Sequence, residues 1–232
     1  MRVTGQGAPA ENLDEAPRRD NAKPGRHQPS LRLIQAETAN QDVASARLAV
    51  ILIADAVAYT RHMAADEAGT YARLTAIHRT IIAPGIARHS ARIIKNTGDG
   101  FLAEFGSATR AVWFAVEFQD AVRFRNARRS RDRRLEFRVG INLGDVIVAP
   151  DDVFGHSVNV AARLEANAEP GGVLVSHAVF TSVRDPRLCF DDVGDLSLGA
   201  MNETVRGFRV GAGAARRSRR SRHHEARGVM DG

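Results

Sequence analysis

The sequence has little cysteine and no long apolar run, and each absence excludes some classes of protein. Of its 232 residues only Cys189 is a cysteine, so no disulfide can form within the chain, which fits a reducing compartment. The longest apolar run, LAVILIA, is much shorter than the roughly 20 residues that span a bilayer. The first residues also lack the apolar core of a signal peptide. We therefore expect a cytoplasmic protein.

The positive charge of the chain is local. The formal net charge is +6 and the sequence pI is about 10.5, values that are typical of proteins that bind nucleic acid or membrane surfaces. Most of the excess, however, comes from two arginine-rich stretches, 123–134 and 216–227. We therefore discount the high pI as a guide to the substrate of the central region, and the sequence indicates no clear nucleic-acid or membrane partner.

Composition divides the chain into three parts. Residues 1–44 are rich in Ala, Pro, Asn, Gln and charge without a sustained period, and they are predicted to be disordered. Residues 212–232 form a basic tail that is predicted to be disordered as well. Residues 45–211 carry the periodic apolar pattern of one domain, and the chain is 44% hydrophobic, enough to bury a core.

The apolar periodicity of this region predicts an α+β fold. Strands, helices and turns alternate as strand, helix, hairpin, helix, strand, which is the split β-α-β order of a ferredoxin-like sheet with helices on one face. Pro84 is expected to kink or break the first helix, and Ser107 to cap the second. A turn is expected at Gly144–Asp145. The expected elements are strand 47–55, a helix from about residue 66 to 89, strand 91–97, strand 101–105, helix 107–127, strands within 135–149, helix 155–168, strand 171–176, a short helix and two terminal strands.

Two aspartates end apolar segments of this pattern. Asp55 closes the first strand, and Asp99 lies in the Gly-Asp-Gly turn after the second. A right-handed crossover makes these strands parallel and leaves room for a third strand between them. Both carboxylates are thus expected at one edge of the sheet, where a pair of acids suits Mg²⁺. Taken singly, an aspartate at such a position is more often a cap or a turn former.

Four motifs resemble the catalytic domain of class III adenylate and guanylate cyclases. The resemblance runs from about Arg47 to Val210, with the motifs in the order and at the spacing of that family. The motifs are ADAVAYT, KNTGDGFLAEF, RVGINLGDVIV and DDVFGHSVNVAARLE. The resemblance implies the class III cyclase fold.

The resemblance also implies a metal site and a base-selecting pair. The metal ligands of the family fall on the side chains of Asp55 and Asp99 and on the backbone carbonyl of Ala56, which would hold two Mg²⁺ or Mn²⁺ ions. The base-selecting residues fall on Lys95 and Asp152. Lysine with aspartate is the adenylate-forming combination, because adenine offers an acceptor to an ammonium group and an amine to a carboxylate.

Two further residues belong to the helix VNVAARLE. Asn159 and Arg163 are four residues apart, so they share one face of a helix. By resemblance, Asn159 orients the ribose and Arg163 stabilises charge on the α-phosphate. The implied reaction is cyclisation of ATP in a homodimer with its sites at the interface, and the regulator is not indicated.

Two basic phosphate contacts of the family are missing. Asp145 stands where animal members have an arginine, and Gly199 stands where a lysine grips the triphosphate. Weak ATP binding is expected unless Arg206 or another base compensates. A catalytically silent cyclase-like binding module therefore stays open as an alternative, as does a guanylate cyclase, although Lys95 and Asp152 disfavour the latter.

Overall fold

The computed structural model describes residues 46–149, 152–197 and 203–212. The predicted N-terminal extension and nearly all of the predicted basic tail lie outside these residues, and so does Gly199. In order, the elements are β1 (Ala46–Ala56), α1 (Tyr59–Ala65), α2 (Glu67–Ile77), the π-helical turn η1 (His78–Ile82), α3 (Ala83–Arg88), β2 (Arg92–Asn96), β3 (Gly100–Phe105), α4 (Ala108–Asn126), the 3₁₀ turn η2 (Arg131–Arg133), β4 (Phe137–Val148), β5 (Val153–Phe154), α5 (His156–Asn167), β6 (Val173–Ser176), α6 (His177–Ser182), β7 (Leu188–Ser197) and β8 (Thr204–Ala212).

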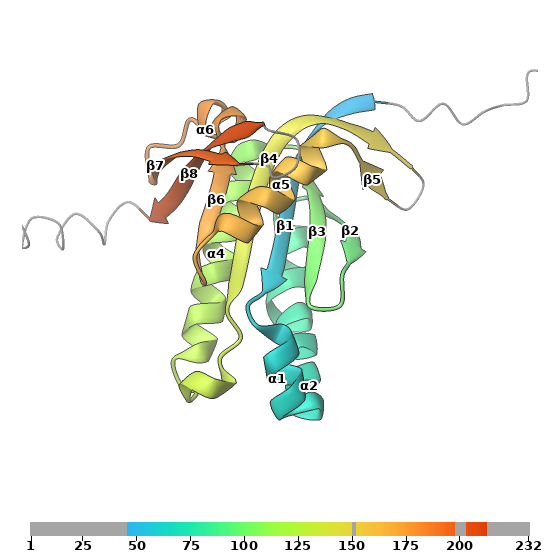
Figure 1. The fold of residues 1–232 in the computed structure, drawn as a ribbon, viewed down its shortest axis with the longest axis vertical. Helices are drawn as coiled ribbons and strands as arrows, with labels where there is room; N and C mark the ends of the chain where they lie inside the picture. The colour runs from blue at the N-terminus through green and yellow to red at the C-terminus, as the bar shows by residue number, and fades with distance from the viewer. Residues whose placement is uncertain (1–45, 150–151, 198–202, 213–232) are drawn as a thin grey trace, which may run out of the picture. The chain divides into compact units, whose positions relative to one another are not determined.

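The sheet has β3 between β1 and β2, as predicted from the sequence. Its order is β2-β3-β1-β4-β6-β8-β7, with β5 paired to β4 (Figure 1). β3 pairs antiparallel with both β1 and β2, so β1 and β2 run parallel with β3 between them. The first four strands and the helices between them form the ferredoxin-like unit, and the α+β prediction is confirmed.

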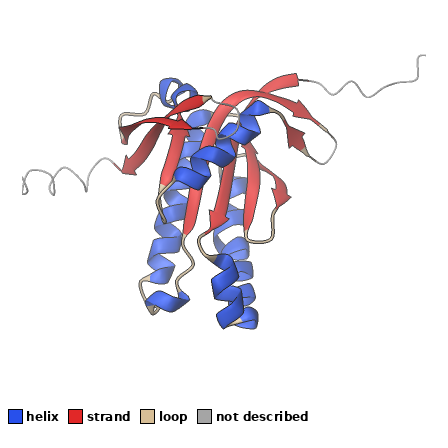
Figure 2. Cartoon of the chain, in the orientation of Figure 1, coloured by secondary structure: helices blue, strands red, loops and turns tan. Residues whose placement is uncertain are grey.

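Helices cover both faces of the sheet, as Figure 2 shows with helices in blue and strands in red. Side chains alternate along β1, so Val50, Leu52 and Ala54 join the main core with α2, α3 and α4. Ile51 points to the other face, where Ala161 of α5 packs against it. The helices of the ferredoxin-like unit share one face as expected, whereas α5 lies on the opposite face.

Local signals place the starts of α2 and α4. The Asp66 carboxylate accepts the N–H of Gly69 at 2.9 Å and so caps α2, close to the predicted start. Ser107 caps α4 by accepting the N–H of Arg110, as predicted. Pro84 has no N–H to donate and lies in the first turn of α3. The helix does not break there, because the π-helical turn η1 precedes α3 and joins it to α2.

The prediction of a turn at Gly144–Asp145 is wrong. β4 continues through both residues and pairs with β1 over eleven positions, from Ala46–Ile147 to Ala56–Phe137. Gly144 is small for a different reason, because a Cβ there would lie 2.4 Å from the hydroxyl oxygen of Ser157 in α5. The glycine thus permits close helix packing and does not mark a turn.

Candidate active site

The structure brings the two predicted metal aspartates together. Asp55 lies at the end of β1, on the face covered by α5, and its register partners are Gly100 on β3 and Arg138 on β4. Asp99 precedes β3 in the turn from β2. The backbone N–H of Ala56 donates to the carbonyl oxygen of Asp99 at 3.2 Å, which ties the two segments to each other.

The two carboxyl groups interact strongly. Burial, followed by repulsion from Asp99 and hydrogen bonding with it, raises the pKa of Asp55 to about 6. The N–H of Ala56 and the positive charge of Arg138 act in the opposite direction on this pKa. Two half-buried acids with one nearby cation leave an excess of negative charge, and a bound divalent cation would neutralise it.

Glycine is required beside the aspartates. A Cβ on Gly100 would lie 2.1 Å from the carbonyl oxygen of Ala54 and 2.9 Å from a carboxylate oxygen of Asp55. Gly98 has φ +96°, a conformation that side-chain-bearing residues rarely adopt. The Gly-Asp-Gly sequence therefore lets the β2–β3 turn approach β1 closely enough for the carboxylates to meet.

The donors at this site fit Mg²⁺ or Mn²⁺. Carboxylate oxygens with few other ligands are typical of Mg²⁺ sites, which retain water or substrate oxygens. Among the described residues no group of three or more His, Cys, Asp or Glu side chains is arranged to hold a metal ion. A resident cation would thus rely on Asp55, Asp99 and backbone or substrate oxygens.

Glu165 is an acidic residue near this site that the sequence analysis missed. Burial and the negative charge of Asp55 raise the pKa of Glu165 to about 7, with Asp99 contributing and Arg138 opposing. Its neighbours follow from the contact of α5 with β4, where a Cβ on Gly140 would lie 2.2 Å from the Glu165 backbone nitrogen. Helical spacing alone could not show which strand residues Glu165 would face.

The predicted base-selecting residues also meet. The ammonium group of Lys95 on β2 donates to the carboxylate of Asp152 at 2.8 Å, although 57 positions separate them in the chain. The Lys95 side chain is 57% exposed and that of Asp152 is 22% exposed. This hydrogen bond, together with the N–H of Val153, holds the pKa of Asp152 below its usual range.

The two remaining predicted residues, Asn159 and Arg163, lie on α5. Asn159 is exposed and Arg163 is half-buried. Residues two positions apart on a helix point about 200° away from each other. Because Glu165 interacts with Asp55, Arg163 starts from a different side of α5 than the one next to the metal aspartates of its own chain.

The two missing phosphate contacts are only partly described. Asp145 is exposed on β4, while Gly199 lies outside the described residues. Arg206, the residue considered as a replacement, donates to the Asp192 carboxylate at 3.0 Å through Nε and 2.5 Å through a terminal nitrogen. Arg206 would have to leave this ion pair to reach a phosphate.

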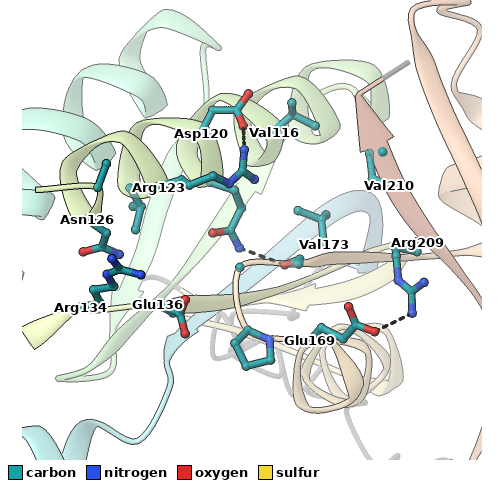
Figure 3. A pocket seen from close by; sticks show the side chains of 17 residues that line it. Val116, Asp120, Arg123, Asn126, Arg134, Glu136, Glu169, Val173, Arg209 and Val210 are labelled. Carbon is teal, nitrogen blue, oxygen red and sulfur yellow. Dashed lines mark hydrogen bonds and ion pairs between the residues drawn. The ribbon is translucent and has the colours of Figure 1, made fainter. Parts of the chain in front are cut away.

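A cavity of about 610 Å³ lies elsewhere, between α4, the start of β4 and the end of β8. Figure 3 shows charged side chains around it, with Arg123 paired to Asp120 and Arg209 paired to Glu169. None of the predicted site residues lines this cavity. This cavity is therefore separate from the candidate active site.

Comparison with known proteins identifies the family. Residues 43–210 match the model of the adenylate and guanylate cyclase catalytic domain. The chain belongs to this family. A solved adenylate/guanylate cyclase/hydrolase from Silicibacter pomeroyi is 38% identical, with a TM-score of 0.66, covering 71% of this chain and 96% of that one. The class III cyclase fold and the predicted resemblance are thus confirmed.

Relatives named as adenylate cyclases are among the matches. A Rhizobium meliloti protein provisionally named adenylate cyclase 3 is 48% identical over 133 residues, covering 57% of this chain and 23% of that protein. An adenylate cyclase of Streptomyces coelicolor is 32% identical over 148 residues, covering 63% of this chain and 36% of that protein. The chain thus spans only about a quarter to a third of these relatives. None of its described helices has the length and apolarity needed to cross a bilayer.

Proposed function

We propose that this cyclase domain converts ATP to 3′,5′-cyclic AMP and pyrophosphate. The proposal depends on one observation, the close approach of Asp55 and Asp99 at the carboxyl edge of β1. The similarity to proteins named as adenylate cyclases supports it.

Asp55, Asp99 and the backbone carbonyl of Ala56 would hold two Mg²⁺ or Mn²⁺ ions. When bound, such a pair lowers the pKa of the ribose 3′-hydroxyl and neutralises charge on the departing pyrophosphate. The chain contributes two carboxylates held a short distance apart by the Gly100 contact and by the backbone hydrogen bond between Ala56 and Asp99.

Lys95 and Asp152 select the base. The ammonium group of Lys95 donates to a ring nitrogen of adenine, and the carboxylate of Asp152 accepts from its exocyclic amine. Guanine presents a carbonyl oxygen in place of that amine, so Asp152 would face an acceptor at a cost of about 1–3 kcal/mol. Their hydrogen bond of 2.8 Å keeps both groups within reach of one base edge before the nucleotide arrives.

Asn159 and Arg163 act on the sugar and the phosphate. Asn159 orients the ribose, and the guanidinium of Arg163 stabilises negative charge that develops on the α-phosphate. In the reaction, the 3′-oxygen forms a bond to the α-phosphorus, the bond from that phosphorus to the bridging oxygen breaks, and pyrophosphate leaves with the electron pair. The 3′-hydroxyl proton passes to solvent, and no protein nucleophile takes part.

A homodimer would complete the site. Arg163 lies about 160° around α5 from Glu165, the residue of this helix that interacts with Asp55, so a second copy would be the source of the Arg163 that acts at each aspartate pair. Three large apolar side chains on one face of the β1, β4 and β5 ends support such a contact, Leu48, Ile147 and Phe154, with exposures of 64%, 44% and 51%. A two-fold dimer would then carry two equivalent sites.

Product formation by the full chain tests this function. We expect cyclic AMP from ATP with Mn²⁺ or Mg²⁺ and less cyclic GMP from GTP. Lys95→Glu combined with Asp152→Cys should shift the preference toward GTP, and Asp99→Ala should abolish product while the thermal transition remains cooperative. An unchanged preference in the double variant would refute the base assignment.

The same assay distinguishes the alternatives. No product from either nucleotide at any protein concentration would favour a catalytically silent cyclase-like module. The observation behind this alternative is the exposed Asp145, which stands in place of an arginine. For a site shared between chains, specific activity should rise with protein concentration near the dimer dissociation constant. Constant specific activity down to a monomeric sample would exclude a shared site.

A further inference from the structure

The end of α4 and the turn after it form a strongly basic surface. The segment 123–134 contains seven arginines and one aspartate, Asp132, which leaves a formal charge of +6 on twelve residues. Of these arginines, Arg123, Arg128, Arg131 and Arg133 are exposed. We call the segment 123–134 the arginine turn.

An exposed aromatic side chain lies within the arginine turn. Phe124 is 77% exposed, while the apolar face of α4 is buried in the core. It lies between Arg123 and Arg125 in the sequence and is the one aromatic residue of the segment. A large apolar side chain that is flanked by arginines and left in water is typical of surfaces that enter a membrane interface.

Ion pairs among the described residues leave most of the charge of the arginine turn unneutralised. Arg123 pairs with Asp120 at 2.5 Å. In the part of the chain that the structure describes, Arg128, Arg131 and Arg133 form no ion pair within 4 Å. Such a density of like charge is self-repelling, so an anionic partner would lower its free energy.

The arginine turn lies at one end of the domain. Figure 1 shows the end of α4 and its turn at the foot of the view, beside α1 and α2. Charge interactions between Arg133 and Asp66 and between Arg73 and Asp132 agree with this neighbourhood. None of the proposed catalytic or metal-binding residues belongs to the arginine turn.

We infer that the arginine turn docks on an anionic phospholipid bilayer, with Phe124 entering the interface and the arginines contacting headgroups. A protein partner that receives a side chain in a groove, or a nucleic acid that stacks on several aromatics, fits less well. Phe124 does not line the cavity between α4 and β8 or the small pocket at Arg184–Arg187, and it has no aromatic neighbour in the segment. A flat, anionic surface requires only dispersed positive charge and one inserted apolar side chain.

Co-sedimentation of the full chain with lipid vesicles tests the inference. At about 0.1 M salt we expect binding to vesicles of phosphatidylcholine with phosphatidylglycerol and little binding to phosphatidylcholine alone. Phe124→Ser should weaken binding about tenfold. Replacing Arg128, Arg131 and Arg133 together by Gln should weaken it about hundredfold, because each arginine near the surface contributes roughly a factor of five.

Two matched controls separate this surface from charge in general. Replacing Arg216, Arg217 and Arg219 by Gln removes the same charge from the basic tail, and Tyr71→Ser removes another exposed aromatic. Both controls should keep most of the vesicle affinity. The inference is overturned if the tail variant loses as much affinity as the arginine-turn variant, or if Phe124→Ser binds like the wild type. Equal losses of affinity for single-stranded RNA and for vesicles would overturn it in favour of a nucleic-acid surface.

Discussion

Asp55→Asn should stabilise the metal-free protein at neutral pH while abolishing its activity. The side chain of Asp55 is partly buried next to Asp99, and both features disfavour its charged form. Without a bound cation the folded chain must either keep the Asp55 carboxylate protonated or hold its negative charge partly buried beside Asp99. Asparagine has nearly the same shape and carries no charge, so the substitution removes the repulsion and retains the packing.

The size of the effect follows from the pKa of Asp55, which is raised from 3.8 to about 6 in the folded chain. Between these pH values the folded state binds more protons than the unfolded state, so stability falls as the pH rises through this window. A pKa shift of one unit corresponds to about 1.4 kcal/mol, so above pH 6 the charge on Asp55 lowers the free energy of unfolding by about 3 kcal/mol in total. Because asparagine also loses some hydration, we expect a gain of about 1–2 kcal/mol, or roughly 4 °C in Tm.

Urea unfolding in EDTA at pH 8 and at pH 5 measures this gain. At pH 8 Asp55→Asn should be more stable than the wild type, and at pH 5 the difference should shrink because Asp55 is mostly protonated there. Asp120→Asn, at an exposed position paired with Arg123, serves as the control and should give no gain at either pH. Added Mn²⁺ should stabilise the wild type at pH 8 and Asp55→Asn much less.

Two results would refute this reasoning. Equal or lower stability of Asp55→Asn at pH 8 would mean that Asp55 is not under electrostatic strain, and so that the two carboxylates are apart in solution. An equal gain at pH 5 and pH 8 would mean that packing, and not charge, is responsible.

Three substitutions test the scaffold around the site, each by urea unfolding at pH 7. Gly140→Ala should cost about 3 kcal/mol or more, because its Cβ would lie 2.2 Å from backbone atoms of α5. Gly98→Ala should cost about 1–2 kcal/mol, because φ is +96° there. Gln119→Leu should cost about 1–3 kcal/mol, because the buried Gln119 amide donates to the carbonyl oxygens of Phe137 and Gly172, each at 2.9 Å. Wild-type stability in all three would contradict the packing described.

The arrangement of the two aspartates could be predicted because chain topology is a strong constraint. A helix between two strands makes them parallel, and a following hairpin strand fills the gap. This logic placed Asp55 and Asp99 at one edge without any side-chain detail. The local turn prediction at Gly144 was wrong, because a glycine that permits contact with Ser157 looks in the sequence like a glycine that permits a turn.

The contacts between the sheet and α5 could not be predicted from the sequence pattern. The helix itself was predicted from its period, yet its rotation over the sheet depends on which small strand residues accept it. Gly140 and Gly144 fix that rotation, and through it Glu165 comes to face Asp55. The pairing of Arg206 with Asp192 likewise depends on the β7–β8 register, which no local motif specifies.

The candidate site is where this chain departs from local folding preferences. Ala58, three residues after Asp55, adopts the left-handed conformation with φ 54°, which is unfavourable for alanine. Asp55 and Glu165 are half-buried acids that share Arg138 as a nearby cation. A sequence selected for stability alone would have removed these features, since each has a simple replacement. Their concentration around one pair of carboxylates therefore supports a role in binding cations and nucleotide more strongly than either aspartate does singly.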